Sequence, residues 1–249
     1  MEHLEGRISI LAALEARLRR MEVVLVSASA HPEKVADLIA AAERAGVPVK
    51  RVPADELDRM AHGRTHGGAV AVTGPRPPTP FDDLLRTLDA GGTPALLLIL
   101  EGIDDGRNLG FVLRSAEALG AHGVLVKRHV WDYDGPEVSR ASSGAYERFP
   151  IVRIDEVAGP VAALRKRGVG IWGCLAGAKR TLYDADLAKP VLLAVGGEKR
   201  GLSGALRELC DGFLSIPSQE GAASLSLSHA AAILLGEATR QRCNKGITG

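Results

Sequence analysis

The 249-residue sequence has few cysteines and no long apolar segment. Its three cysteines, Cys174, Cys210 and Cys243, are widely spaced and form no CxxC pair, so the sequence suggests neither a disulfide framework nor a zinc site. No uninterrupted apolar run approaches the roughly 18 residues of a membrane span. Glu2 and Glu5 stand where a signal peptide needs a positive start. We therefore expect a cytoplasmic protein with no membrane partner and no bound metal.

The sequence also lacks an excess of either charge. Its formal net charge is +1, whereas a dedicated electrostatic binder of nucleic acid is usually more basic. Any contact with RNA must therefore use a local basic patch. Short basic clusters, which are more often solvated faces, lie at residues 17–20, 127–128, 165–167 and 199–200.

The first part of the chain reads as a small α/β module. The composition, 46% hydrophobic and 24% charged, is that of a soluble globular protein, and the length allows two domains. Apolar spacing predicts helices at 8–18 and 32–45, strands at 23–26, 47–52 and 69–73, and a short helix capped by Asp55. This alternation predicts a βαβ-type domain over residues 1–73.

A proline-rich segment follows. Four prolines between residues 75 and 80 cannot belong to a packed helix or a central strand. We therefore expect a linker over residues 74–93.

Residues 94–249 alternate more strongly between strands and helices. The pattern predicts strands at 95–100, 123–126, 151–154, 170–175, 191–195 and 212–216, with helices at 109–119, 137–141, 155–167, from about 203, and 225–242. The apolar runs 96–100 and 191–195 do not alternate with polar residues, as expected for strands buried on both faces of a parallel sheet.

Three segments of this region could carry chemistry. The first, residues 108–114, opens a helix in which Gly110 and Arg114 share a face. A helix N-cap is the alternative role for Asn108, and a salt bridge to Glu117 is the alternative for Arg114. The strand, turn and helix context places both residues at the carboxyl edge of a parallel sheet, where ligands of open α/β folds bind.

The second segment, residues 195–201, places Glu198 after two glycines, where a carboxylate can approach a ligand without steric hindrance. Its spacing is not that of a phosphate-binding P-loop, and the alternative is a turn with Glu198 in solvent. The third segment, residues 224–228, sets serines at alternate positions near the start of the last helix, whose free amides can hold an anion. Alternatively, Ser224 caps that helix.

His62 and His66 are four residues apart. Glycines at 63, 67 and 68 favour a turn over a metal-binding helix around them. The pair therefore does not change the expectation of no metal.

In this order and spacing, the three segments resemble the motifs of the SpoU (TrmH) branch of the SPOUT superfamily, the knotted RNA ribose 2'-O-methyltransferases. Residues 66–72 resemble the end of the small substrate-binding domain of the RlmB subgroup, which modifies a guanosine of large-subunit ribosomal RNA. The resemblance implies a parallel-sheet α/β catalytic domain over 94–249 with a deep C-terminal trefoil knot, an exception to the rule against threaded chains, preceded by a small α/β RNA-binding domain. It also implies S-adenosyl-L-methionine as cofactor, RNA as partner, and a homodimer with the active site near the subunit interface.

The resemblance also implies the residues of the site by motif position. It assigns cofactor binding to Leu175, Gly196, Gly197, Ile216 and Leu225, and a catalytic group to Asn108, Arg114, Glu198, Ser224 and Ser226. A guanidinium hardly ever loses its proton in a protein. We therefore expect Arg114 to hold an RNA phosphate and stabilise the developing alkoxide, oriented by Glu198 and Asn108, and not to act as the base.

Two positions depart from the family pattern. Ser226 stands where the family usually has Asn, and Gly106 where it usually has Pro; His229 is a further unusual residue. Because a hydroxyl cannot replace both functions of a planar amide, Ser226 could weaken catalysis or alter the substrate. The resemblance favours methylation of ribosomal RNA over transfer RNA, with an RNA-binding homologue that has lost turnover as the alternative. An unrelated nucleotide-binding protein would need a GxGxxG or P-loop signature that is missing here.

Overall fold

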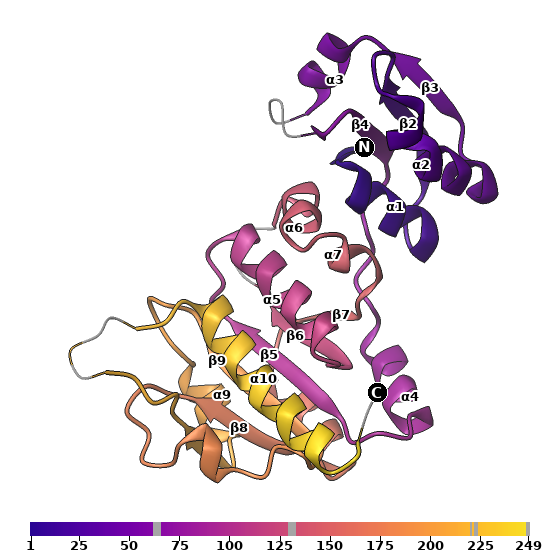
Figure 1. Cartoon of the computed structure of the whole chain (residues 1–249). Coiled ribbons are helices and arrows are strands. Elements are labelled where there is room, and N and C mark those ends of the chain that lie inside the picture. The colour runs from indigo at the N-terminus through magenta and orange to yellow at the C-terminus, as the bar shows by residue number, and fades with distance from the viewer. Residues whose placement is uncertain (62–65, 129–132, 220, 222–223, 248–249) are drawn as a thin grey trace. The chain divides into compact units, whose positions relative to one another are not determined.

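The structure is a computed structural model of the chain, and it describes residues 1–61, 66–128, 133–219, 221 and 224–247 (Figure 1). The chain divides into two compact units. Unit 1 comprises Met1–Pro77 and Tyr133–Phe149, and unit 2 comprises Pro78–Asp132 and Pro150–Gly249. Among the described residues, no helix is long and apolar enough to cross a membrane.

Unit 1 contains a four-stranded sheet in the order β1-β4-β2-β3, formed by β1 (Glu2–Glu5), β2 (Met21–Ser27), β3 (Val49–Val52) and β4 (Ala69–Thr73). Its other elements are α1 (Arg7–Ala16), α2 (Pro32–Ala45) and α3 (Ala54–Met60). Alternate residues of β2 point to opposite faces. Val24 and Val26 pack in a cluster with α1 and α2, while Leu25 packs with Leu57 of α3. The predicted α/β module is confirmed.

Two details of unit 1 differ from the expectation. Strand β1 was not predicted, because its sequence contains no apolar run. It forms because its backbone pairs antiparallel with β4. Asp55 does not cap α3, because Pro53 holds the N-cap position. Asp55 instead lies in the first turn and pairs with Arg59 at 2.9 Å.

Two short helices far along the sequence, α6 (Gly135–Ala141) and α7 (Ala145–Arg148), also belong to unit 1. They pack against α1 and β1. The buried side chain of Arg19 lies 3.0 Å from Glu147 of α7 and 2.9 Å from Glu2, and Arg140 of α6 lies 2.7 Å from the buried Glu5. The sequence pattern assigns residues 133–149 to the domain over 94–249. Helical periodicity does not show which domain a helix packs against, so this difference was not predictable from it.

Unit 2 contains a six-stranded sheet, in the order β10-β8-β9-β5-β6-β7, and every neighbouring pair is parallel. The strands are β5 (Leu96–Glu101), β6 (Gly123–Lys127), β7 (Ile151–Ile154), β8 (Gly170–Cys174), β9 (Val191–Gly196) and β10 (Gly212–Leu214). The helices are α4 (Phe81–Ala90), α5 (Gly106–Ala118), α8 (Ala158–Arg165), α9 (Gly204–Glu208) and α10 (Leu227–Asn244), with a 3-10 turn at Leu182–Asp184. The predicted parallel sheet is confirmed.

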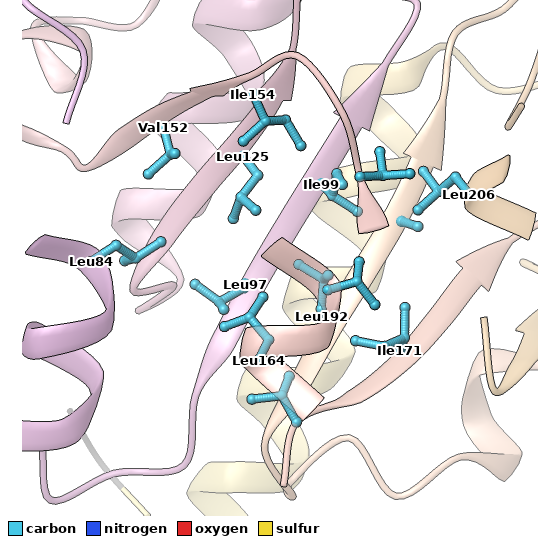
Figure 2. Packing of buried hydrophobic residues seen from close by; sticks show 14 of the residues in the cluster. Leu84, Leu97, Ile99, Leu125, Val152, Ile154, Leu164, Ile171, Leu192 and Leu206 are labelled. Carbon is cyan, nitrogen blue, oxygen red and sulfur yellow. The ribbon is translucent and has the colours of Figure 1, made fainter. Parts of the chain in front are cut away.

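The sheet of unit 2 is covered on both faces. Figure 1 shows α5 and α10 side by side across one face, and the two helices pack against each other. Figure 2 shows the apolar cluster of the opposite face, where Leu84 of α4 and Leu164 of α8 lie beside Leu97 and Ile99 of β5. Burial on both faces explains why the strand sequences are unbroken apolar runs.

Helix α4 lies inside the range predicted as a linker. It begins at Phe81, directly after the last proline of the segment, and buries Leu84 and Leu85. The prolines end where the helix begins because Pro80 can serve as its N-cap without needing a free N–H. The linker expected over 74–93 is therefore helical from residue 81 to residue 90.

Candidate active site

A cavity of about 230 Å³ opens at the carboxyl edge of the sheet in unit 2, where the chain leaves β8, β9 and β10 and enters α10. This edge is where open parallel sheets bind ligands. All five predicted cofactor residues line it: Leu175, Gly196, Gly197, Ile216 and Leu225. Glu198 and Ser224 line it as well.

The loop after β9 packs so closely that only glycine fits at its start. A Cβ on Gly196 would lie 2.2 Å from the carbonyl carbon of Gly201, and one on Gly197 would lie 1.9 Å from the oxygen of Gly102. The Gly197 N–H donates to the carbonyl of Glu101 at 2.7 Å, which ties this loop to the end of β5. The two glycines are therefore required by close backbone approach.

A second cavity, of about 250 Å³, adjoins the first. Gly197, Glu198 and Leu227 line both cavities, so the two share a wall. Asn108 of α5 lines the second cavity, as do Gly102, Ile103, Asp104, Asp105 and Lys199. The structure thus brings Asn108, Glu198 and Ser224 to one pair of adjoining cavities.

A buried carboxylate that the sequence reasoning missed supports this edge. Glu101 ends β5, and its side chain accepts hydrogen bonds from Ser203 N at 2.7 Å, Ser203 Oγ at 2.8 Å and Lys127 Nζ at 2.6 Å. Burial alone would raise the pKa of Glu101, but the hydrogen bonds from Lys127 and Ser203 outweigh it, so the pKa is lowered. A charge closing an apolar strand is the signal that could have revealed it.

Helix α5 starts earlier than expected. Asp105 is its N-cap, with a side chain that accepts from Arg107 N at 2.8 Å, so Asn108 is not the cap but lies in the first turn. Gly106 is the first helical residue, a position where proline is also favoured. The family's proline would therefore fit the same backbone, and this departure leaves the helix start unchanged.

Arg114 lies two turns along α5 from these residues. Its side chain is exposed, and among the described residues it lines neither of the two cavities. The structure of one chain therefore does not bring Arg114 together with Glu198.

The start of α10 also differs from the expectation, because Ser226 and not Ser224 is the N-cap. The Ser226 hydroxyl accepts from the backbone N–H of His229 at 3.4 Å and contacts the Nδ1 atom of the same residue. It also lies 3.1 Å from Ser228 Oγ, which donates to Asn108 Oδ1 at 3.1 Å. The third segment is thus joined directly to the first.

The histidines and cysteines of the sequence take other positions. His66 is buried, contacts Asp58 at 3.0 Å and accepts from Gly68 N, whereas His62 lies outside the described residues. Burial raises the pKa of the Cys174 and Cys210 thiols to about 11. In the part of the chain that the structure describes, no three His, Cys, Asp or Glu side chains cluster as metal ligands.

Comparisons with known proteins place this geometry in a class. Residues 95–236 match the SpoU rRNA Methylase family, and residues 3–79 match the RNA 2'-O ribose methyltransferase substrate-binding family. The fold and the two matched regions are those of an RNA 2'-O-ribose methyltransferase with a small N-terminal domain. The chain belongs to the SpoU rRNA methylase family, as its motifs predicted.

Individual relatives agree with this placement. The chain is 35% identical over 237 residues to the 23S rRNA (guanosine-2'-O-)-methyltransferase RlmB of Xylella fastidiosa, covering 95% of each chain. It is equally similar, at 35%, to an uncharacterized tRNA/rRNA methyltransferase of Mycobacterium avium, covering 95% of this chain and 76% of the other. The solved SpoU methyltransferase AviRb of Streptomyces viridochromogenes, in complex with AdoMet, aligns with a TM-score of 0.82 at 27% identity, over 97% of this chain and 90% of that one.

Proposed function

We propose that the protein transfers a methyl group from S-adenosyl-L-methionine to a ribose 2'-hydroxyl of RNA, on a guanosine of large-subunit ribosomal RNA. The observation that carries the proposal is the pair of adjoining cavities at the sheet edge, whose linings together include residues from all three motifs. The guanosine-specific RlmB relative, which this chain matches over nearly the whole of both lengths, supports the choice of nucleotide.

The lining of the first cavity fits the cofactor. Leu175, Ile216 and Leu225 supply an apolar wall suited to an adenine ring, and Gly196 and Gly197 have no side chains to fill the cavity. When bound, the cofactor supplies an electrophilic methyl group on a sulfonium. We propose that these residues hold it so that the methyl faces the second cavity, which Glu198 shares.

The second cavity would then receive the ribose. A 2'-hydroxyl is a poor nucleophile until its proton leaves or its developing charge is stabilised. Asn108 and Glu198 can orient the sugar hydroxyls, with Ser224 at the border of the cofactor cavity. Much of the rate enhancement would then come from positioning.

Arg114 has a different part in the proposal. Its guanidinium keeps its charge and can bind a phosphate with two parallel hydrogen bonds. Because it is exposed and outside both cavities of its own chain, it suits an RNA phosphate better than an enclosed cofactor. We include the homodimer in the proposal, since a site near the interface could join Arg114 of one copy to the cavities of the other.

The N-terminal module would bind the RNA away from the reacting ribose. The match of residues 3–79 to a substrate-binding family supports this role for residues 1–73. An RNA substrate of the ribosome makes the cytoplasm the expected location. The deep trefoil knot implied by the motifs stays a prediction.

The test is transfer of labelled methyl from S-adenosyl-L-methionine to ribosomal RNA and, separately, to transfer RNA, each lacking ribose methylation. We expect 2'-O-methylguanosine in the ribosomal RNA, and its loss in Arg114→Ala. Incorporation into transfer RNA alone would show that the substrate is transfer RNA and not ribosomal RNA. No incorporation into either RNA, with cofactor still bound, would favour the homologue that has lost turnover and point to Ser226.

A further inference from the structure

A chain of four polar side chains runs from an exposed histidine to the second cavity. His229 Nδ1 contacts Ser226 Oγ, Ser226 Oγ lies 3.1 Å from Ser228 Oγ, and Ser228 donates to Asn108 Oδ1 at 3.1 Å. Ser228 is buried, so its hydroxyl exchanges little with solvent. The chain includes both Ser226 and His229, the two unusual residues of the third segment.

With Oδ1 of Asn108 facing Ser228, the number of available protons fixes the direction of this chain. A hydroxyl has one proton to donate and two lone pairs that accept. Ser228 donates its proton to Asn108, so the contact between the two serines needs the proton of Ser226. Ser226 then has none for the imidazole, and the short contact with Nδ1 requires that His229 donate.

Ser226 is fully satisfied in this arrangement. Its two lone pairs accept from the backbone N–H and from Nδ1–H of His229, and its proton goes to Ser228. If Nδ1 carried no proton, one contact of the chain would lack a hydrogen. The neutral histidine must therefore carry its proton on Nδ1.

The last member of the chain is the amide that faces the ligand. Ser228 donates to one of the two lone pairs of Oδ1, and this hydrogen bond fixes the amide so that the two N–H donors of Nδ2 lie on the side away from Ser228. Asn108 lines the second cavity beside Glu198. An N–H donor held there can bind only an acceptor, such as a hydroxyl or phosphate oxygen of the substrate.

We propose that His229 is a positioning residue for methyl transfer, which acts through Ser226 and Ser228 to hold the Asn108 amide with its N–H donors toward the substrate. The catalytic consequence rests on the proposed function, whereas the protonation of His229 does not. Ser226, which stands where the family usually has Asn, thereby takes part with His229 in orienting Asn108.

The first test needs no activity. Nitrogen-15 NMR of the full chain, with the His229 signals assigned by comparison with His229→Asn, reports which ring nitrogen carries the proton in the neutral form. We expect Nδ1–H. A neutral ring protonated on Nε2 would overturn the proposal, whatever the enzyme does.

The second test is kinetic. Removing one hydrogen bond of the chain costs about fivefold in rate, so His229→Ala should lower kcat about fivefold and leave the KM for S-adenosyl-L-methionine unchanged. His229→Asn, which places an N–H near the position of Nδ1, should restore kcat, while His229→Phe, which keeps a ring without a donor, should not. Thermal unfolding of each variant shows that it is folded.

A double-mutant cycle separates action through Ser228 from a local effect on the helix cap. If His229 acts through Ser228, His229→Ala should cost nothing further in a Ser228→Ala background. The same fivefold loss in both backgrounds, or no loss in an active wild-type background, would overturn the proposal. A wild-type chain that transfers no methyl to any RNA would instead be a failure of the proposed function, and the NMR result would decide the inference alone.

Discussion

Both units bury a glutamate beside a cation, but the two glutamates do different work. In unit 1, Glu147 of α7 faces Arg19, and neither residue lines either of the two cavities. In unit 2, Glu101 faces Lys127 and also receives two hydrogen bonds from Ser203, at the edge where the cavities lie. Both are pairs of a carboxylate with a cation. Their roles differ because Glu101 lies at the end of a strand that borders the cavities, whereas Glu147 does not.

The pKa shifts of these two acids run in opposite directions. Burial is the largest influence on Glu147 and raises its pKa, although Arg19 opposes it. Burial also acts most strongly on Glu101, but Lys127 and Ser203 together lower its pKa. A carboxylate that accepts several hydrogen bonds is stabilised in its charged form. We infer that Glu101 orders the loop after β9, while Glu147 joins α7 to the N-terminal module.

The largest expected effect is on the stability of unit 1. Arg19→Ala leaves Glu147 buried without its cation, which typically costs about 3–5 kcal/mol. Urea unfolding of the full chain should show this loss. Replacing both residues, with Arg19→Met and Glu147→Leu, should recover most of it because no unpaired charge remains. An unchanged Arg19→Ala protein would mean that the pair does not hold the unit together.

The next effect should fall on the site in unit 2. Gly197→Ala forces the loop away from Gly102, and a displacement of about 1 Å in an active site can cost roughly 100-fold in rate. Methyl transfer and cofactor affinity should both drop. Gly236→Ala is the matched control, since nothing lies within 4 Å of its added Cβ on α10; it should leave both unchanged.

A smaller effect sharpens the comparison directly. Glu101→Gln keeps the size of the side chain but weakens charged hydrogen bonds worth about 1.5–3 kcal/mol each, so cofactor affinity should fall by roughly tenfold or more. Glu147→Gln should leave cofactor affinity unchanged. Calorimetric titration with S-adenosyl-L-methionine measures both. Equal losses in the two variants would contradict the separate roles.

The smallest effect is in the pH dependence of stability. The lowered pKa of Glu101 adds stability above its unfolded value of about 4.3, and this is lost as the pH falls through the folded pKa. The raised pKa of Glu147 acts oppositely, because ionising it in the folded protein costs stability as the pH rises from its unfolded value through the folded one. Melting temperatures should be measured from pH 3 to pH 8. The Glu101→Gln curve should lie below that of wild type at neutral pH and approach it at low pH, where Glu101 becomes protonated. For Glu147→Gln, the stability relative to wild type should instead rise across that range. Parallel curves would contradict the assigned shifts.

The sequence predicted the fold best in segments whose apolar composition directly indicates burial. The parallel strands of unit 2 were predictable because runs such as Leu96–Leu100 are buried on both faces. Strand β1 and helix α4 were missed, since one depends on pairing with a distant strand and the other begins directly after prolines that suggested a linker. Local propensity does not show that β1 pairs with β4 or that α4 packs on the sheet of unit 2.

The candidate site shows the same division. The residues to which the resemblance assigned cofactor binding line one cavity. The contacts of Glu101 with Ser203 and of Ser228 with Asn108 were not predictable, because each joins residues more than 100 positions apart. Arg114 was expected beside Glu198, and one chain does not bring them together. Tertiary contacts, not local pattern, determine these features.

The measurement that tests the account most directly is a crystal structure of the chain with S-adenosyl-L-methionine bound. We expect the cofactor against Leu175, Ile216 and Leu225, with its methyl directed at the wall formed by Glu198 and toward Asn108. A cofactor bound elsewhere, or one whose methyl points away from Asn108 and Glu198, would contradict the assignment of the two cavities.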